Sequence, residues 1–161
     1  MPLTLPSPHN RGEGQGEGSE PTPKEQPMRL KKAEREFIMF QRVCRVATVG
    51  KNGRPHNVPV CPILDGDRIY FGSAADGIKA QNVRANPRVA LVYDEYTEAW
   101  QGLKGILVWG TARVFDAGPT FRRIRTLLYQ RYPQYEGFAA IEEKDSAVIE
   151  VTPTRTFSWG L

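Results

Sequence analysis

The dipeptide Asn52-Gly53 is the feature that most constrains how this chain can fold. It lies between two stretches rich in valine and other strand-forming residues, residues 43–49 and 55–61. Asn-Gly readily adopts the positive φ angles of a two-residue type I′ turn, which connects adjacent antiparallel strands. The sequence therefore predicts a tight β-hairpin at this point.

The predicted turn also sets the register of the two strands. With Asn-Gly at its centre, Cys44 lies opposite Cys61 and Val46 lies opposite Pro59. Pro55 and Pro59 then occupy non-hydrogen-bonded sites, where the missing N–H costs this hairpin nothing. Each proline denies a donor to a strand on its other side, so we expect unpaired backbone groups there that can face a ligand.

The hydrophobic pattern predicts the remaining elements. Strand-like stretches occur at residues 68–73, 88–94, 103–115 and 147–151, with 156–159 as a final candidate. Helical patterns occur at residues 31–41, from a cap at Asp76 to Arg84, and from a cap at Thr120 to Arg131. Short turns join most strands. We therefore expect a mainly β (α+β) fold, a six-stranded antiparallel barrel with three peripheral helices.

Two of these helices are amphipathic. In the first, Phe37, Ile38 and Phe40 are apolar, whereas the solvent-facing side is expected to carry Lys31, Lys32, Glu34, Arg35 and Glu36. In the last, Phe121, Ile124 and Leu128 share one face. Each helix is therefore expected to cover the sheet with that apolar face.

The composition divides the 161-residue chain at Met28. Residues 1–27 contain six prolines and four glycines and have a net charge of −2. Such a segment buries too little apolar surface to offset its ordering entropy, so we expect a disordered tail or the product of an upstream start codon. Residues 28–161 form the predicted domain; their 20 basic and 14 acidic groups give a net charge of +6, which favours an anionic ligand.

Several classes of protein do not match this sequence. It has neither a run of about 18 apolar residues nor a secretory leader, which predicts a cytoplasmic protein without membrane contact. Two cysteines cannot form a disulfide scaffold, and in a reducing compartment we expect Cys44 and Cys61 to be free thiols. With His9 and His56 as the only histidines, no metal site is visible.

The segment from residue 70 to residue 89 carries the strongest chemical pattern. A predicted strand brings the hydroxyl of Ser73 and a loop of small residues to the start of a helix, and Lys79 lies in the first turn of that helix. Free N–H groups and the helix dipole attract anions at such a terminus. This arrangement predicts a phosphate site.

Five segments together resemble the pyridoxamine 5′-phosphate oxidase-like split-barrel family. They occur in the family's order: Arg45-Val46-Ala47-Thr48-Val49, Gly53-Arg54-Pro55-His56-Asn57-Val58-Pro59-Val60, Ile78-Lys79-Ala80-Gln81-Asn82-Val83, Asn86-Pro87-Arg88-Val89-Ala90-Leu91 and Trp109-Gly110-Thr111-Ala112-Arg113-Val114. The resemblance covers residues 30–159. It implies a split-barrel homodimer with FMN or a deazaflavin bound at the subunit interface.

The resemblance also implies which residues bind the cofactor. Lys79 matches the lysine that binds the cofactor phosphate, and Ser73 matches a hydroxyl position on the preceding strand. The strand beside the flavin ring corresponds to Val58, Pro59, Val60 and Cys61. Asn82 belongs to the same helix motif as Lys79, and Trp159 is our first candidate, with Trp100, for an aromatic wall against a flat ring.

The chain also departs from the authentic oxidase. That enzyme has a phosphate-binding arginine where this chain has Val58, and a glutamine where it has Gly105; its C-terminal arginine and histidine are missing here. Oxidation of vitamin B6 is therefore not expected. The motifs Tyr93-Asp94-Glu95-Tyr96 and Arg131-Tyr132-Pro133-Gln134-Tyr135, with Trp100 and Trp159, look more like the coenzyme F-420-dependent subgroup.

These comparisons lead to an expected function. We expect an oxidoreductase that transfers a hydride between coenzyme F-420, or alternatively FMN, and a small organic acceptor. The positive domain, including Arg84, Arg88 and Lys104, suits the anionic tail of coenzyme F-420. No catalytic proton donor stands out; Tyr96, Lys104 and an exposed His56 are candidates that more often serve structural roles.

Two other functions remain open. The same barrel could bind FMN or haem without turnover. A nucleic-acid-binding barrel would use the basic helix that carries Arg122, Arg123 and Arg125, but the aromatic residues that stack on bases are not interleaved with them. We therefore expect a small-molecule substrate and no nucleic-acid partner.

Overall fold

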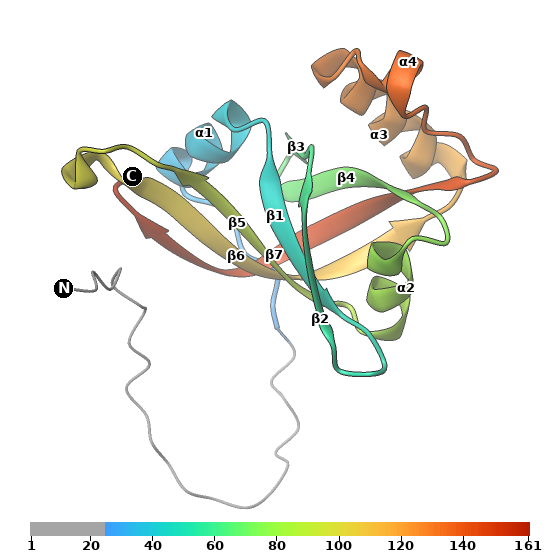
Figure 1. Cartoon of the computed structure of the whole chain (residues 1–161), viewed down its shortest axis with the longest axis horizontal. Helices are drawn as coiled ribbons and strands as arrows, with labels where there is room; N and C mark the ends of the chain where they lie inside the picture. Colours follow the sequence, from blue (N-terminus) through green and yellow to red (C-terminus); the bar gives the residue numbers. More distant parts are fainter. Residues whose placement is uncertain (1–24) are drawn as a thin grey trace, which may run out of the picture.

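The computed structural model describes residues 25–161, which form one curled antiparallel sheet of seven strands with helices packed on it (Figure 1). The strands are β1 (Cys44–Val49), β2 (Pro55–Val60), β3 (Ile63–Asp65), β4 (Arg68–Ala74), β5 (Arg88–Glu95), β6 (Lys104–Phe115) and β7 (Ser146–Trp159). Their order across the sheet is β2-β1-β5-β6-β7-β4-β3. The predicted antiparallel barrel is confirmed, with one more strand than expected.

The extra strand is β3, which is too short to give a periodic pattern in the sequence. The two candidate stretches near the C-terminus are instead one strand, β7, which pairs with β6 from Val148 to Trp159. The pairing shifts between Trp109 and Gly110 of β6, which marks an irregularity in the register. The two edge strands, β2 and β3, are joined only by Cys61 and Pro62, so the sheet curls back on itself and stays open along β2.

The β1–β2 hairpin forms, but its register is one residue away from the predicted one. Cys44 pairs with Val60 and Val46 pairs with Val58. A shift of one residue exchanges the faces of a strand. Val58 and Val60 therefore join Cys44 and Val46 on the core side of the sheet.

The turn explains the shift. The Gly53 N–H donates to the Gly50 carbonyl over 3.1 Å, and Gly53 has a φ of 71°. No non-glycine residue of the described chain has a positive φ, so Asn52 cannot adopt a type I′ turn. A type I turn followed by a left-handed glycine makes the loop one residue longer, and every pair moves by one.

Four α-helices and a short 3-10 helix surround the sheet: α1 (Lys32–Phe40), α2 (Ile78–Ala85), η1 (Trp100–Gly102), α3 (Gly118–Arg131) and α4 (Tyr135–Phe138). The predicted caps were wrong. The residue before α2 is Gly77, not Asp76, and α3 begins at Gly118 with Pro119 in its first turn, before Thr120. The N-cap residues of α2 and α3, Gly77 and Ala117, make no side-chain capping bond.

The face of α1 also differs from the prediction at two positions. Phe37 and Ile38 are buried as expected, but Phe40 is 77% exposed and Glu34 is only 2% exposed. Glu34 accepts hydrogen bonds from the Lys31 N–H over 2.9 Å and from the Thr156 hydroxyl over 2.8 Å. These two bonds compensate for burying its carboxylate.

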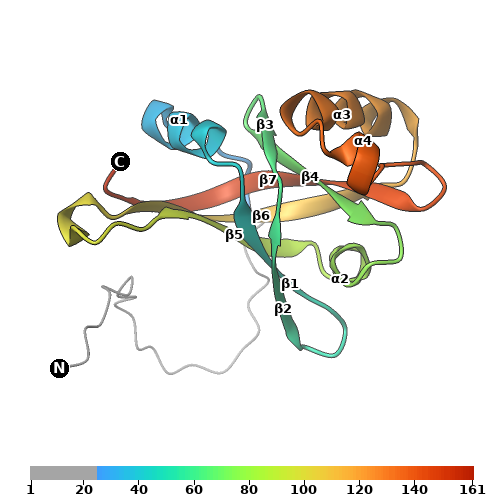
Figure 2. The same ribbon diagram turned by 45° about the horizontal axis from the view of Figure 1, so that its top comes forward.

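Two apolar clusters hold the sheet in this shape. Figure 2 shows α1 and α3 above the long strands β6 and β7, and α2 below them. The larger cluster joins the sheet to α1 and α2, through residues such as Phe37, Ala80 and Leu91. The second lies under α3, whose Phe121, Ile124 and Leu128 are buried as predicted. Because the first half of β7 is covered on both faces, residues 146–151 show no alternation of buried and exposed side chains.

The predicted tail, residues 1–27, lies outside the described residues except for its last three. At this end of the domain the Met28 N–H donates to the Pro153 carbonyl over 2.9 Å. Among residues 25–161, no helix is long and apolar enough to cross a membrane.

Candidate functional site

The start of α2 presents free backbone donors. Gly77 precedes the helix in an extended conformation, and no side chain caps it. The N–H groups of Ile78, Lys79 and Ala80 have no intrahelical acceptor, because they belong to the first turn of the helix. These donors, together with the positive end of the helix dipole, favour a negatively charged ligand.

Lys79 and Ser73 lie beside these donors. Lys79 is half-buried and makes no ion pair within residues 25–161, and burial lowers the pKa of its ammonium group. The Ser73 hydroxyl donates to the Ala74 carbonyl over 3.0 Å. A Cβ on Gly77 would lie 3.3 Å from the Ser73 hydroxyl oxygen, which shows how closely β4 approaches the helix. The structure therefore brings Ser73 to the same helix terminus as Lys79.

The edge of β2 provides free backbone groups, as the prolines predicted. β2 is an edge strand of the sheet, so among the described residues no strand pairs with its outer side. Val58 and Val60 direct their side chains toward the core, Pro59 is exposed, and Cys61 is half-buried just beyond the end of the strand. A ligand along this edge would therefore meet mainly backbone.

Asn82 connects α2 to the hairpin. Its side-chain amide donates to the Thr48 hydroxyl over 3.0 Å. A Cβ on Gly50 would overlap the Asn82 carboxamide, so the base of the hairpin turn lies directly against it. Asn82 thus fixes α2 against β1, close to the site.

His56 does not match its predicted exposure. It is half-buried, and its Nδ1 atom is enclosed without a hydrogen-bond partner in the described residues. His56 is paired with Thr48, so its side chain lies on the inner face of the hairpin. The prediction of a fully solvent-exposed histidine next to the turn was wrong because the turn is longer than expected.

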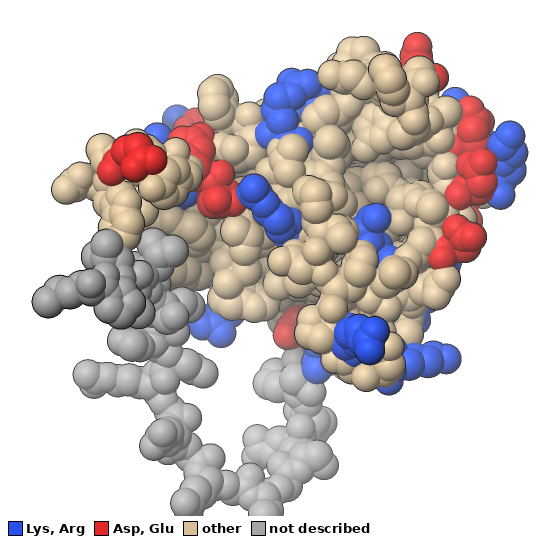
Figure 3. All heavy atoms as spheres, in the orientation of Figure 1, with Lys and Arg blue, Asp and Glu red and all other residues tan. Residues whose placement is uncertain are grey.

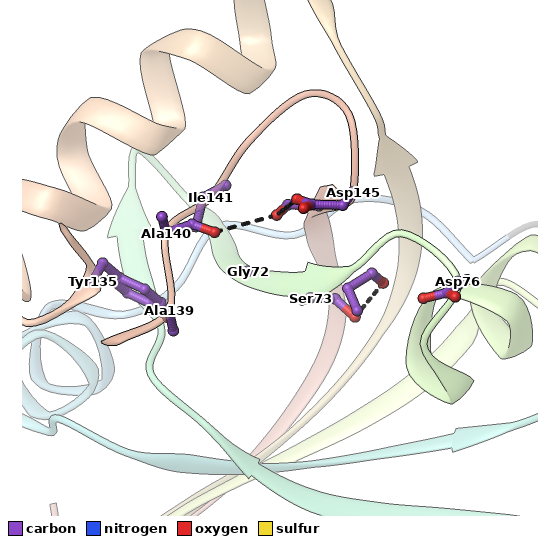
Figure 4. Close-up of a pocket in the computed structure, with 10 residues that line it drawn as sticks. Gly72, Ser73, Asp76, Tyr135, Ala139, Ala140, Ile141 and Asp145 are labelled. Carbon is purple, nitrogen blue, oxygen red and sulfur yellow. Dashed lines mark hydrogen bonds between the residues drawn. The ribbon is translucent and has the colours of Figure 1, made fainter. Parts of the chain in front are cut away.

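A pocket of about 450 Å³ adjoins Ser73 (Figure 4). Its lining comes from the end of β4, from α4 and from the loop before β7: Gly72, Ser73, Ala74, Asp76, Tyr135, Ala139, Ala140, Ile141, Asp145 and Ser146. Figure 4 shows Ser73 and Asp76 on one side and Tyr135 and Ala139 on the other. Figure 3 shows this face of the molecule hollowed between the α3–α4 region and the hairpin.

Tyr135 is the site residue that sequence reasoning missed. Burial raises the pKa of its phenol to about 12, so the hydroxyl stays protonated even at mildly alkaline pH and can donate a hydrogen bond. Its ring packs edge-on against Tyr132, with ring centres 6.0 Å apart. The motif around Tyr135 was noted in the sequence, but only the tertiary fold places it opposite Ser73.

Trp159 is not brought to this site within one chain. It lies at the far end of β7, whose other end pairs with β4 through Ser146 and Ala74. Tyr96 and Lys104 are exposed and belong to the Trp159 end of the sheet. Arg84 is also not free, because it forms an ion pair with Asp116. One chain therefore brings Lys79, Ser73 and the start of α2 next to a pocket, but provides no aromatic wall from Trp159.

Comparison with known proteins identifies the family. The family model described as pyridoxamine 5′-phosphate oxidase matches residues 30–160. The chain belongs to this family. The resemblance seen in the sequence is confirmed, and the curled seven-stranded sheet is the family's split barrel.

Proteins similar to this chain have names that report different activities. A 5a,11a-dehydrotetracycline/5a,11a-dehydrooxytetracycline reductase of Streptomyces rimosus subsp. rimosus is 34% identical over 92 residues, which cover 54% of this chain and 65% of the reductase. The solved structure of an F-420 reductase has a TM-score of 0.64 and 21% identity, over 80% of this chain and 98% of that one. The haem storage protein HutZ of Vibrio cholerae has a TM-score of 0.67 and 18% identity, over 81% and 94%.

Proposed function

We propose that this protein is an oxidoreductase that uses coenzyme F-420, or alternatively FMN, to reduce a small organic acceptor. One observation carries this proposal: the uncapped start of α2, with half-buried Lys79 and Ser73, lies next to a pocket of about 450 Å³. The similarity to a reductase over 54% of the chain supports it.

The residues present suit a cofactor with a phosphate and a flat ring. Lys79, the Ser73 hydroxyl and the N–H groups of the first turn of α2 would bind the phosphate. The free backbone edge from Val58 to Cys61 would lie along the ring system. When bound, such a cofactor supplies the hydride, and the chain contributes binding, orientation and exclusion of water. Asn82 holds α2 and the hairpin in place around it.

Two charge features bear on which cofactor is used. Residues 28–161 carry a net charge of +6, which suits the anionic tail of coenzyme F-420. The phosphate of FMN would use the same Lys79 and Ser73. The structural similarity to an F-420 reductase supports the deazaflavin as the first choice.

A homodimer would complete the site. On the side of the sheet away from the core, Val92, Leu107 and Phe157 form one paired row, and Phe157 is 40% exposed. An apolar face of this kind is typical of an interface. A second copy packed on it could bring its Trp159 to the pocket, which the first copy's own Trp159 cannot reach.

Cofactor or haem binding without turnover is the second candidate, favoured by the structural similarity to HutZ. His56 is the only histidine of residues 25–161, and its Nδ1 is enclosed. The chain therefore offers few haem ligands near the pocket. Nucleic-acid binding receives no support, because Arg122, Arg123 and Arg125 each pair with a carboxylate of the chain.

The decisive test is titration of the full chain with FMN and with coenzyme F-420, followed by fluorescence. Lys79→Ala should weaken binding by at least about tenfold, because a charge-assisted hydrogen bond contributes roughly 1.5–3 kcal/mol. Lys32→Ala is the matched control, since Lys32 is an exposed lysine on α1. Failure of both cofactors to bind would overturn the proposal.

The pH dependence provides a second check. Because burial lowers the pKa of Lys79, its positive charge is lost at a lower pH than that of an ordinary lysine. Cofactor affinity should therefore fall as pH rises through this lowered pKa, and Lys79→Ala should remove that fall. Reduction of an acceptor by the loaded enzyme then separates an oxidoreductase from a carrier.

A further inference from the structure

The pocket beside Ser73 is lined mostly by small or apolar residues. Gly72, Ala74, Ala139, Ala140 and Ile141 contribute no charge to its lining. Two apolar side chains near these residues in the sequence are strongly exposed: Phe138, which precedes Ala139, at 92%, and Ile78, the first residue of α2, at 58%. The pocket is therefore suited to an apolar molecular body that enters between α2 and α4.

The charged groups that line this pocket are both carboxylates. Asp76 precedes α2, and Asp145 precedes β7. Neither forms an ion pair within residues 25–161; the Asp145 carboxylate accepts a hydrogen bond from the Ser146 hydroxyl over 2.9 Å. Figure 4 shows Asp76 beside Ser73 and Asp145 on the loop above it.

Three other carboxylates at this end of the molecule are neutralised. Three arginines pair with them: Arg84 with Asp116, Arg122 with Glu143 and Arg125 with Glu142. Figure 3 shows acidic side chains gathered along this edge of the hollow. Unlike these three, the two carboxylates that line the pocket have no basic partner among residues 25–161, and neither has Glu136 on α4.

We propose that this pocket selects acceptors with an apolar body and a protonated amine, the amine being bound between Asp76 and Asp145. This inference rests on the proposed function, because it assigns the substrate class of the same site. The charge changes sign along the site: Lys79 and the helix N–H groups take the anionic part of the cofactor, and the two carboxylates take the cationic end of the substrate. An anionic acceptor would be repelled.

Probe binding to the cofactor-free full chain tests the charge preference without any turnover. Acridine orange serves as the planar aromatic cation, and 8-anilinonaphthalene-1-sulfonate serves as the aromatic anion. We expect the cation to bind more tightly and its affinity to fall with added salt. Asp76→Asn and Asp145→Asn should each weaken cation binding by about threefold to tenfold, and the double variant by more. Equal or tighter binding of the anion would overturn the proposal.

Two further variants locate the bound probe. Ala140→Trp should fill the pocket and abolish cation binding; if it has no effect, the probe binds elsewhere and the proposal fails. Glu98→Gln changes an exposed carboxylate near η1, at the other end of the sheet, and should leave cation binding unchanged. An equal loss in Glu98→Gln and Asp76→Asn would mean a general surface effect and would also overturn the proposal.

Asp76→Asn separates this inference from the proposed function. Removing the negative charge next to the phosphate site should tighten FMN binding about twofold to tenfold while it weakens binding of the cation. If FMN binds and responds to Lys79→Ala but the carboxylate variants do not affect the cation, only the substrate class is wrong. If FMN and coenzyme F-420 do not bind but the cation preference holds, only the cofactor proposal fails.

Discussion

Gly105 of β6 and Trp159 of β7 share one space. They are paired across the two strands, and a Cβ built on Gly105 would overlap the six-membered ring of the Trp159 indole. The absence of a side chain at residue 105 therefore allows the indole to lie flat over the strand. The authentic oxidase has a glutamine where this chain has Gly105, and this difference has a structural consequence. A glutamine side chain at residue 105 and the Trp159 indole in its present position would exclude each other.

Gly105→Gln should displace the Trp159 indole. We expect a loss of about 1–3 kcal/mol in the free energy of unfolding from overpacking, together with a change in tryptophan fluorescence. The double variant Gly105→Gln/Trp159→Ala should recover part of this loss, since the clash disappears. If the losses in the free energy of unfolding of the two single variants simply add in the double variant, the two side chains do not compete for the same space.

Glu34→Ala should destabilise the fold by about 2–4 kcal/mol in urea unfolding. The change removes a buried carboxylate and leaves the partly buried Lys31 N–H and Thr156 hydroxyl without their acceptor. Glu34→Gln keeps an acceptor oxygen and should cost less. Glu36→Gln is the matched control on the same helix, since its side chain is 65% exposed and its ion pair with Lys32 is weak. A similar loss in Glu36→Gln would show that the burial of Glu34 is not the cause.

The two thiols should react at very different rates with a thiol reagent at pH 8. Burial raises the pKa of Cys44 to about 12 and leaves its side chain inaccessible, whereas Cys61 is half-buried. One thiol per native chain should therefore react, and the second only after unfolding. Cys61→Ser should remove the reactive thiol. A native chain in which both thiols react quickly would contradict the burial of Cys44.

Alkaline pH should destabilise the fold through tyrosine. The pKa values of Tyr70 and Tyr135 are raised from 10 to about 12, with burial as the main cause for both. Between these values the unfolded chain releases protons that the folded chain retains. Stability therefore falls as pH rises from about 10 to about 12, by less than about 1.4 kcal/mol per pH unit for each tyrosine.

Urea unfolding at pH 9, 10 and 11 measures this decline. Tyr135→Phe should make it shallower, because the variant has no phenol to ionise at this position. Tyr70→Phe is a less direct test, since it also removes the hydrogen bond that the Tyr70 hydroxyl donates to Glu150 over 2.8 Å. An unchanged pH dependence in Tyr135→Phe would show that its pKa is not raised by folding.

Local sequence patterns predicted most of the elements correctly. The Asn52-Gly53 turn, the alternation of the strands and the apolar face with Phe121, Ile124 and Leu128 each depend on residues close in sequence. Such patterns report backbone preference and amphipathicity, which the tertiary structure then uses. The sequence could also predict that Lys79 and Ser73 lie close together, because the strand, the loop and the helix start that carry them follow one another directly.

Contacts between distant residues could not be predicted in this way. The pattern of α1 placed Glu34 on the exposed side, because nothing in the helix indicates that Thr156 of β7 lies against it. The half-burial of His56 and the position of Tyr135 opposite Ser73 likewise depend on packing between separate elements.

The sequence by itself determined the antiparallel strands, the hairpin and the placement of Ser73 and Lys79 around the start of α2, because short-range backbone preferences and periodic burial encode them. Only the tertiary structure decided the hairpin register, the separation of Trp159 from Lys79 within one chain, and the two unpaired carboxylates at the pocket. These features depend on how a curled sheet brings together residues far apart in the chain, and no local pattern carries that information.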